Sequence, residues 1–230
     1  MKTIGLIGGM TWVSTAEYYT IINRTVNQRM GGVHSAKIQM RSLDFGEIKA
    51  CIDRNDWQTI AEIIVAAAKS LEISGADCIV LCANTAHKVS REVRNATSLP
   101  LIHIAEVTAQ ALTKASVTKA GLLGTNFTMM DSFFKDALAK EEIEALVPGD
   151  DDRIFIHNSI FDELGKEIFA PATKSRYLRI IDSLAQRGAG GIILACTEIP
   201  LLIKPEDCTL PLFNTTEIHA AGAVDFALGE

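Results

Sequence analysis

The chain has 230 residues, of which 48% are hydrophobic and 22% are charged, a composition that excludes intrinsic disorder and suits one large or two small globular domains. Its formal net charge is -6, and its Lys and Arg residues are scattered rather than clustered, which argues against binding to nucleic acid. No apolar run approaches the roughly 20 residues of a bilayer span, so we expect a cytoplasmic protein that does not enter a membrane.

Strand and helix signals alternate along the first half of the chain. A capping-box pattern, Ser14-x-x-Glu17, predicts the start of a helix that ends at Gly31-Gly32. Apolar alternation and short apolar runs predict the strands, and a helix is expected directly after Asn84. The predicted elements are strands over residues 3–7, 36–43, 78–82 and 101–104, and a long helix over residues 57–73.

The second half of the chain repeats the first. Residues 75–85 align with residues 188–198 at an offset of 113 (188 minus 75), which places Ala83 over Cys196. Residues 5–8 align with 121–124, and residues 99–103 with 210–214. Apolar strands entering glycine turns resemble one another in any α/β protein, but three matches in the same order favour a duplication.

The duplication predicts an α/β fold of two similar lobes, each with a mostly parallel sheet flanked by helices and related by a pseudo-twofold. Because the last strand and helix complete the pattern of the first half, we expect discontinuous domains. The expected boundaries are 1–98 plus 208–230 for the first lobe and 99–207 for the second. Sheets of this kind bind ligands outside the carboxyl ends of their strands.

The cysteines and acidic residues give no metal or cofactor signal. The five cysteines form no CxxC pair and no zinc-like ligand set, and their odd number argues against a closed disulfide framework, so we expect reduced thiols. The acidic segment 141–152, around Pro148-Gly149, lacks a histidine and is predicted to be a solvated turn. The glycines near the N-terminus do not match G-x-G-x-x-G, so a nucleotide fold is disfavoured.

Cys196 is the strongest catalytic candidate. It follows an apolar strand-like run, residues 192–195, and precedes Thr197-Glu198, where a helix is expected to start. Backbone amides and a positive helix end would favour the thiolate, which is a base or a nucleophile. The alternative is a buried, inert cysteine.

Several motifs together resemble the aspartate/glutamate racemase family. The resemblance extends over nearly the whole chain and implies a cofactor-independent isomerase that acts at the α-carbon of aspartate or glutamate without pyridoxal phosphate. It also implies a homodimer, and a pair of thiols that face opposite sides of the α-carbon. The matching motifs are Gly8-Gly9-Met10, Leu43-Asp44-Phe45, Asn84-Thr85-Ala86-His87, Gly124-Thr125 and Cys196-Thr197-Glu198.

The sequence departs from this family at the first thiol. Ala83 stands directly before Asn84, where the family usually has cysteine, and a methyl group cannot transfer a proton. Cys82 is one residue early, and alternation along a strand points it toward the core. Thr85 or His87 is a possible substitute base, whereas the structural alternative for His87 is capping or packing.

The same resemblance, together with position at strand ends, nominates binding residues. Asn84, Thr85, Thr125 and Thr197, with the amides after Met10 and Thr125, are expected to hold the α-carboxylate of a small acidic amino acid or dicarboxylate. Arg41 and Lys166 are candidates for the second carboxylate, because family members use basic residues in these regions. The alternative for both is solvated surface charge.

The sequence therefore predicts a racemase-type isomerase that uses the Cys196 thiolate, with activity impaired or one-sided because of Ala83. A one-thiol isomerase or decarboxylase acting on a related diacid is the first alternative. A homologue that binds dicarboxylates without turnover is the second.

Overall fold

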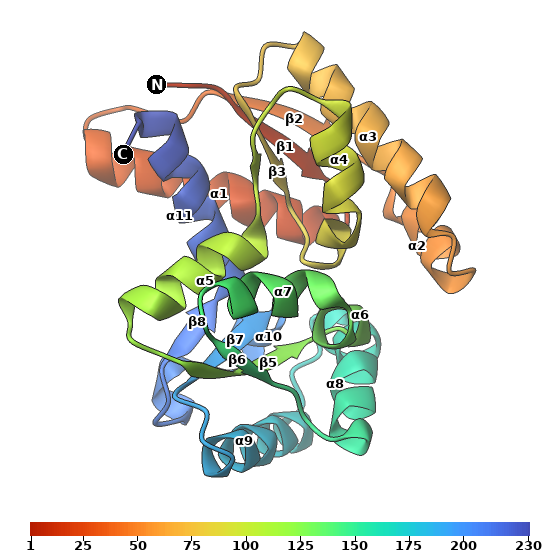
Figure 1. Ribbon diagram of the computed structural model, residues 1–230, viewed down its shortest axis with the longest axis vertical. Coiled ribbons are helices and arrows are strands. Elements are labelled where there is room, and N and C mark those ends of the chain that lie inside the picture. The colour runs from red at the N-terminus through yellow and green to blue at the C-terminus, as the bar shows by residue number, and fades with distance from the viewer. The chain divides into compact units, whose positions relative to one another are not determined.

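Two four-stranded sheets, one from each half of the chain, organise the computed structural model, which describes residues 1–230 (Figure 1). The strand orders are β2-β1-β3-β4 and β6-β5-β7-β8, and every neighbouring pair is parallel. This confirms the predicted fold class. The strands are β1 (Ile4–Gly8), β2 (Ile38–Ser42), β3 (Cys78–Leu81), β4 (Leu101–Ile102), β5 (Lys119–Gly124), β6 (Glu144–Leu146), β7 (Gly191–Ala195) and β8 (Leu212–Asn214).

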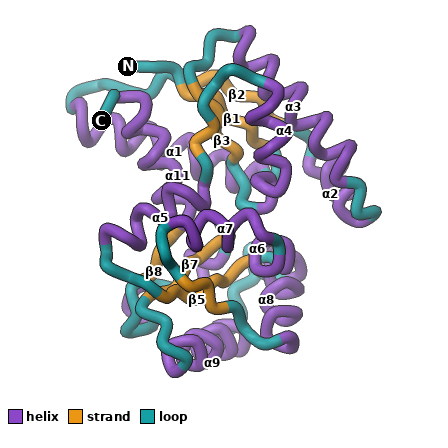
Figure 2. The backbone as a smooth tube through the Cα atoms, in the orientation of Figure 1, coloured by secondary structure: helices purple, strands orange, loops and turns teal.

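Helices connect the strands, as parallel pairing requires, because a parallel neighbour is reached only by a long crossover (Figure 2). No helix combines the length and the apolar character that a membrane span needs. The α-helices are α1 (Trp12–Met30), α2 (Phe45–Asp53), α3 (Trp57–Ile73), α4 (Ser90–Ala96), α5 (Ile104–Lys114), α6 (Asn126–Met130), α7 (Ser132–Lys140), α8 (Asp150–Asp162), α9 (Pro171–Gln186), α10 (Ile199–Leu202) and α11 (Thr215–Leu228). Three short 3-10 helices are η1 (Thr85–Val89), η2 (Leu164–Lys166) and η3 (Pro205–Asp207).

The chain divides into two units. Unit 1 comprises Met1–Ile104 with His219–Glu230, and unit 2 comprises Ala105–Ile218. Both boundaries between the units lie later in the sequence than the expected boundaries, which followed residues 98 and 207. The reason is that β4 pairs with β3 and β8 pairs with β7, so each strand completes the sheet of the strand before it.

Strand register in the two sheets follows the sequence repeat. Gly5 of β1 lies opposite Ile79 of β3, and Gly121 of β5 lies opposite Ile192 of β7. The paired residues of the second sheet follow those of the first by 116 positions (121 minus 5) and 113 positions (192 minus 79), which are the offsets of the sequence repeat. The residue after Ala195 of β7 is Cys196, and the same offset makes Ala83 its counterpart after β3.

The core of unit 1 lies on both faces of its sheet. On one face, residues of α3 pack with Ile79 and Leu81 of β3; on the other, residues of α1 and α11 pack with Cys78, Val80 and Cys82. Successive residues of β3 therefore point to opposite faces, as an extended strand requires. Figure 1 shows α11 beside α1, so the end of the chain covers the face begun by its first strand and helix.

The start of α1 differs from the prediction. Thr11, not Ser14, is the N-cap residue, and its side chain accepts a hydrogen bond from the Ser14 backbone N–H. The Ser14-x-x-Glu17 pattern is therefore not a capping box. The Ser14 hydroxyl instead donates to the Cys82 carbonyl oxygen at 2.6 Å, which ties α1 to the end of β3. Gly9 (φ 88°) forms the turn before the helix, where a Cβ would collide with the Leu43 backbone.

The acidic segment of unit 2 also differs from the prediction of a turn. Glu144–Leu146 form β6, and Asp150 opens α8 with three consecutive aspartates in its first turn. Carboxylates at this position are stabilised by the positive end of the helix dipole. The exposed turn of this segment lies at Glu141 and Glu142, whereas Pro148, in the connection between β6 and α8, is buried.

Candidate active site

The loop after β7 holds Cys196 beside a carboxylate. The Cys196 side chain is only 9% exposed, and its Sγ donates a hydrogen bond to Glu198 Oε2 at 2.8 Å. The Thr197 hydroxyl donates to the same oxygen at 2.7 Å. One carboxylate oxygen thus accepts two hydrogen bonds from the two residues that precede it.

The environment of Cys196 favours the protonated thiol. Burial, followed by the charge of Glu198 and its hydrogen bond, raises the pKa of Cys196 well above its ordinary value. The backbone N–H groups of Thr197 and Glu198 act in the opposite direction but are outweighed. This direction runs against the expected thiolate, because burial and Glu198 outweigh the backbone N–H groups of this loop.

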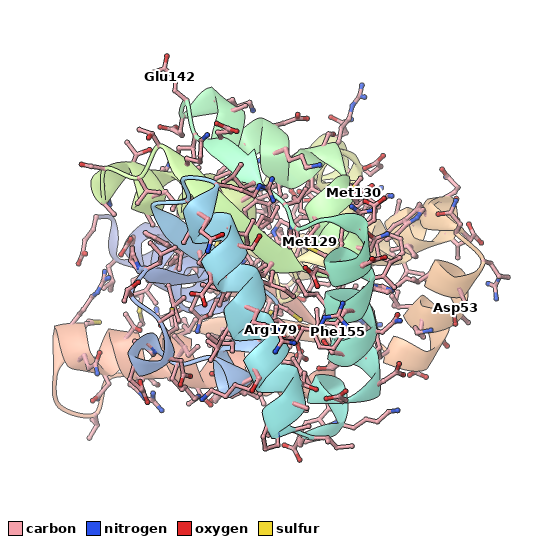
Figure 3. All side chains as sticks on the ribbon, turned by 90° about the horizontal axis from the view of Figure 1, so that it is seen from below. Asp53, Met129, Met130, Glu142, Phe155 and Arg179 are labelled. Carbon is pink, nitrogen blue, oxygen red and sulfur yellow. The ribbon has the colours of Figure 1, made fainter.

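The turn after β5, the neighbouring strand, carries Thr125. Its hydroxyl accepts a hydrogen bond from Thr128 N at 3.4 Å and caps α6, and its side chain is buried. The next residue, Asn126, donates its backbone N–H to His157 Nδ1 of α8 at 3.2 Å. These two hydrogen bonds anchor the turn to both α6 and α8. Within α6, Met129 is buried and Met130 is 45% exposed (both labelled in Figure 3).

The candidates in unit 2 lie at one edge of its sheet. Thr125, Cys196 and Thr197 follow the carboxyl ends of adjacent parallel strands, β5 and β7. Lys166 does not follow a strand. It is the last residue of η2, and its side chain is exposed.

In unit 1 the loop after β3 begins with Cys82 and Ala83 on opposite faces. Cys82 is 2% exposed and belongs to the cluster that faces α1, whereas Ala83 is partly exposed and packs against the cluster that faces α3. The prediction that Cys82 points into the core is confirmed, and burial raises the pKa of its thiol far above the ordinary value.

The other candidates of unit 1 follow the same edge of the first sheet. Asn84 is buried and Thr85, partly buried, opens η1 after β3. Met10 follows the glycine turn after β1 and packs on the core. Arg41 lies on β2 opposite Ile7 of β1, and its side chain is exposed.

His87 hydrogen-bonds the backbone through both of its ring nitrogens. Its Nδ1 donates to the Ala83 carbonyl oxygen at 3.0 Å, and its Nε2 accepts from the Ile104 backbone N–H at 3.2 Å. Burial, with His103 and His219 nearby, lowers the pKa of His87 well below its ordinary value. Both ring nitrogens are occupied, so His87 fixes the position of the Ala83 loop.

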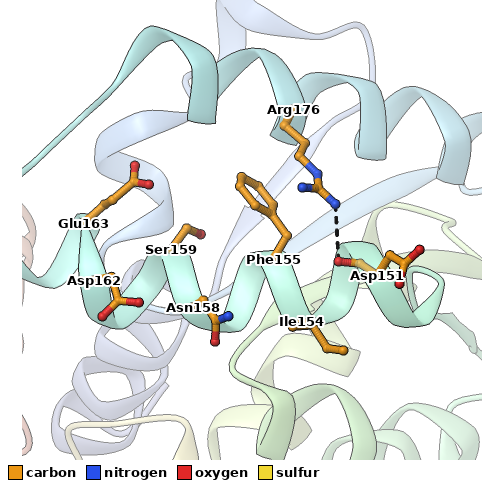
Figure 4. Close-up of a pocket in the computed structure, with 8 residues that line it drawn as sticks. All are labelled: Asp151, Ile154, Phe155, Asn158, Ser159, Asp162, Glu163 and Arg176. Atoms are coloured by element: carbon orange, nitrogen blue, oxygen red, sulfur yellow. Dashed lines mark hydrogen bonds between the residues drawn. The ribbon is translucent and has the colours of Figure 1, made fainter.

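A separate hollow of about 300 Å³ lies along α8 in unit 2 (Figure 4). Its polar lining is mainly acidic, and its single cation, Arg176, is already held by Asp152 at 3.1 Å and stacks on the Phe155 ring at 4.1 Å. An excess of carboxylates repels a diacid, so this hollow does not fit the predicted substrate. The lining residues are Asp151, Ile154, Phe155, Asn158, Ser159, Asp162, Glu163 and Arg176.

A model of the Asp/Glu/hydantoin racemase family matches residues 7–223. This chain belongs to that family. Among solved structures, a putative Asp/Glu racemase from Yersinia pestis is 45% identical, with a TM-score of 0.94 over 99% of this chain and 100% of that chain. PH1733, an aspartate racemase homologue from Pyrococcus horikoshii OT3, is 32% identical, with a TM-score of 0.87 and the same coverage of both chains. The broad specificity amino-acid racemase RacX of Bacillus subtilis is 24% identical over 176 residues, 74% of this chain and 73% of RacX.

Membership of the racemase family confirms the resemblance inferred from the motifs. The solved structures that resemble this chain are described as a putative racemase and a racemase homologue, and racemases are isomerases. The sequence indicated Glu198 only as part of the Cys196-Thr197-Glu198 motif, and its hydrogen bond with the Cys196 thiol was not predicted. The Cys-x-Glu spacing is the signal that was available, since residues two apart in a turn can bring their side chains together.

Proposed function

We propose that this chain is a cofactor-independent amino-acid isomerase that transfers the α-proton of aspartate or glutamate, with Cys196 as the transferring thiol. The observation that carries the proposal is the hydrogen-bonded Cys196 at the carboxyl end of β7, in a chain of the racemase family. Its counterpart in the sequence repeat, position 83, is where a second thiol belongs.

The remaining candidates supply carboxylate binding in this proposal. Asn84, Thr85, Thr125 and Thr197, with the backbone after Met10, offer neutral hydrogen-bond donors at strand ends. Two exposed cations, Arg41 and Lys166, are assigned to the side-chain carboxylate of the substrate. The homodimer implied by the resemblance is part of the proposal and is tested by light scattering coupled to gel filtration.

Ala83 limits this reaction to one thiol. Cys196 takes the α-proton from one face and, after its S–H has exchanged with solvent, returns a proton to that same face, so exchange of the α-proton is expected to exceed inversion of the α-carbon. The same observation favours a second candidate function, a one-thiol isomerisation or decarboxylation of a related diacid, for which one acid–base group suffices. A homologue that only binds dicarboxylates is the third possibility.

Proton exchange separates these functions. In D₂O, NMR of L- and D-aspartate and of L- and D-glutamate should show loss of the α-proton signal with the wild-type protein and none with Cys196→Ala. The control variant is Cys208→Ser. Cys208 lies outside the site, and its Sγ donates a hydrogen bond to the Leu210 carbonyl oxygen. Exchange that survives in Cys196→Ala, or its absence with all four substrates, would contradict the proposal.

A further inference from the structure

Glu198 is the group that the Cys196 thiol proton already contacts. The Sγ–H bond points at Glu198 Oε2 over 2.8 Å, and the Thr197 hydroxyl holds that oxygen in place over 2.7 Å. The three residues are consecutive, so the arrangement is local to the loop after β7 and needs no other part of the chain. From this geometry we propose that Glu198 is the proton acceptor for Cys196, so that the two residues work as an acid–base pair.

The sequence repeat shows that only one of the two equivalent loops carries this pair. At the offset of 113, Ala83, Asn84 and Thr85 correspond to Cys196, Thr197 and Glu198. The first loop therefore lacks both the thiol and the carboxylate, whereas the second has both.

The proton balance of the pair is simple. The S–H bond of Cys196 breaks, its electron pair stays on sulfur, and the proton forms an O–H bond with Glu198 Oε2. The negative charge thereby moves from the carboxylate to the sulfur. The thiolate removes the substrate α-proton and re-forms its S–H bond, this S–H proton exchanges with solvent, and a solvent-derived proton is returned to the carbanion; finally Glu198 gives its own proton back to the sulfur.

Protonation of Glu198 makes the thiolate accessible. The negative charge and the accepted hydrogen bond of Glu198 are two of the causes that raise the pKa of Cys196, and both vanish when the carboxylate is neutral. The backbone N–H groups of Thr197 and Glu198, which stabilise the thiolate, remain. The other titratable group that faces the pair is Tyr177 of α9. Burial raises its pKa, and its hydroxyl is bonded to Ser159 at 3.0 Å, so it stays neutral.

The test measures the alkylation of Cys196 and the exchange of the substrate α-proton. A purely structural role of Glu198 would not make the thiol more reactive and the exchange slower at the same time. Alkylation of Cys196 by iodoacetamide is followed by peptide mass spectrometry from pH 6 to 10, and α-proton exchange is followed by NMR. In Glu198→Gln the alkylation profile should move to lower pH by about one unit or more, because a negative charge is lost. Exchange should nevertheless fall by roughly 10²-fold or more, because the proton acceptor is lost.

Two further variants complete the design. Glu198→Asp keeps a carboxylate and should recover part of the exchange. Glu163→Gln is the matched control, since Glu163 lies in the same unit and accepts a hydrogen bond from Thr173 rather than from the thiol. Its profile and exchange should equal those of the wild type.

The inference is overturned if the alkylation profile of Glu198→Gln superimposes on that of the wild type or moves to higher pH. It is also overturned if exchange in that variant stays within a few-fold of the wild type. The inference rests on the proposed function for its catalytic half only. If the wild-type protein exchanges no α-proton, the proposed function fails, while the alkylation profiles still decide whether Glu198 controls the thiol.

Discussion

The buried His219 makes the stability of unit 1 depend on pH. Its Nε2–H donates to the Ile102 carbonyl oxygen at 2.7 Å, so its Nδ1 accepts from the Tyr18 hydroxyl at 2.8 Å and the ring is neutral. Burial lowers the pKa of His219 from 6.5 to about 4, and the neighbouring His103 acts in the same direction. A histidine whose folded-state pKa is lowered contributes stability above its unfolded pKa and loses it as the pH falls toward the folded pKa. Between pH 7 and pH 4.5 this amounts to about 2–3 kcal/mol.

Urea unfolding of the wild type and of His219→Gln at several pH values tests the magnitude. The glutamine amide can donate and accept but does not titrate, so the variant should lose about 2–3 kcal/mol less than the wild type over this range. Carboxylates such as Asp56, whose pKa is lowered by its hydrogen bonds to Thr59, change both proteins equally. The exposed His34 provides the control, and His34→Gln should follow the wild type. Parallel loss of stability in wild type and His219→Gln would refute the reasoning.

Three further predictions concern the candidate site. Ala83→Cys should raise inversion of both enantiomers of the preferred substrate by roughly 10²–10⁴-fold in a chiral chromatography assay, whereas Ala83→Ser should not. If the wild type inverts the substrate as fast as Ala83→Cys does, another base is present. Cys196→Ser should abolish turnover. Cys82→Ser buries a hydroxyl, so it should lower the free energy of unfolding by about 1–3 kcal/mol and leave the site intact. A Cys82→Ser variant that loses activity but keeps its stability would contradict this. Arg41→Gln or Lys166→Gln should raise KM for acidic substrates more than it lowers kcat, and an unchanged KM in both variants would remove them from the binding site.

The fold could be predicted because the signals were periodic and repeated. The alternation that put Cys82 toward the core is a property of any extended strand, and the offset that aligned Ala83 with Cys196 also reproduces the strand register. Element ends were less predictable. Ser14 satisfied a capping pattern, but its hydroxyl bonds the Cys82 carbonyl oxygen, a tertiary contact that no local rule includes.

The electrostatics of the site could not be predicted for a related reason. Backbone amides and a helix dipole at a helix start predict a thiolate at Cys196. The rotamer of Glu198, which turns a carboxylate onto the sulfur, and the short length of α10 cannot be read from the sequence. The role of His87 was equally hidden, because the Ile104 N–H that it accepts lies 17 residues further along the chain.

The packing of α11 on the first sheet sets an order for synthesis. Residues 219–230 leave the ribosome after the whole of unit 2, yet Ala220 and Val224 complete the same core as Ile4 and Tyr18, and the Lys2 N–H bonds the Ala227 carbonyl oxygen at 2.9 Å. Unit 2 is a continuous segment and can fold while the nascent chain is still growing. Unit 1 must wait with part of one apolar face of its sheet covered by α1 alone, and a nascent chain arrested before α11 would expose the rest of that face to chaperones and proteases.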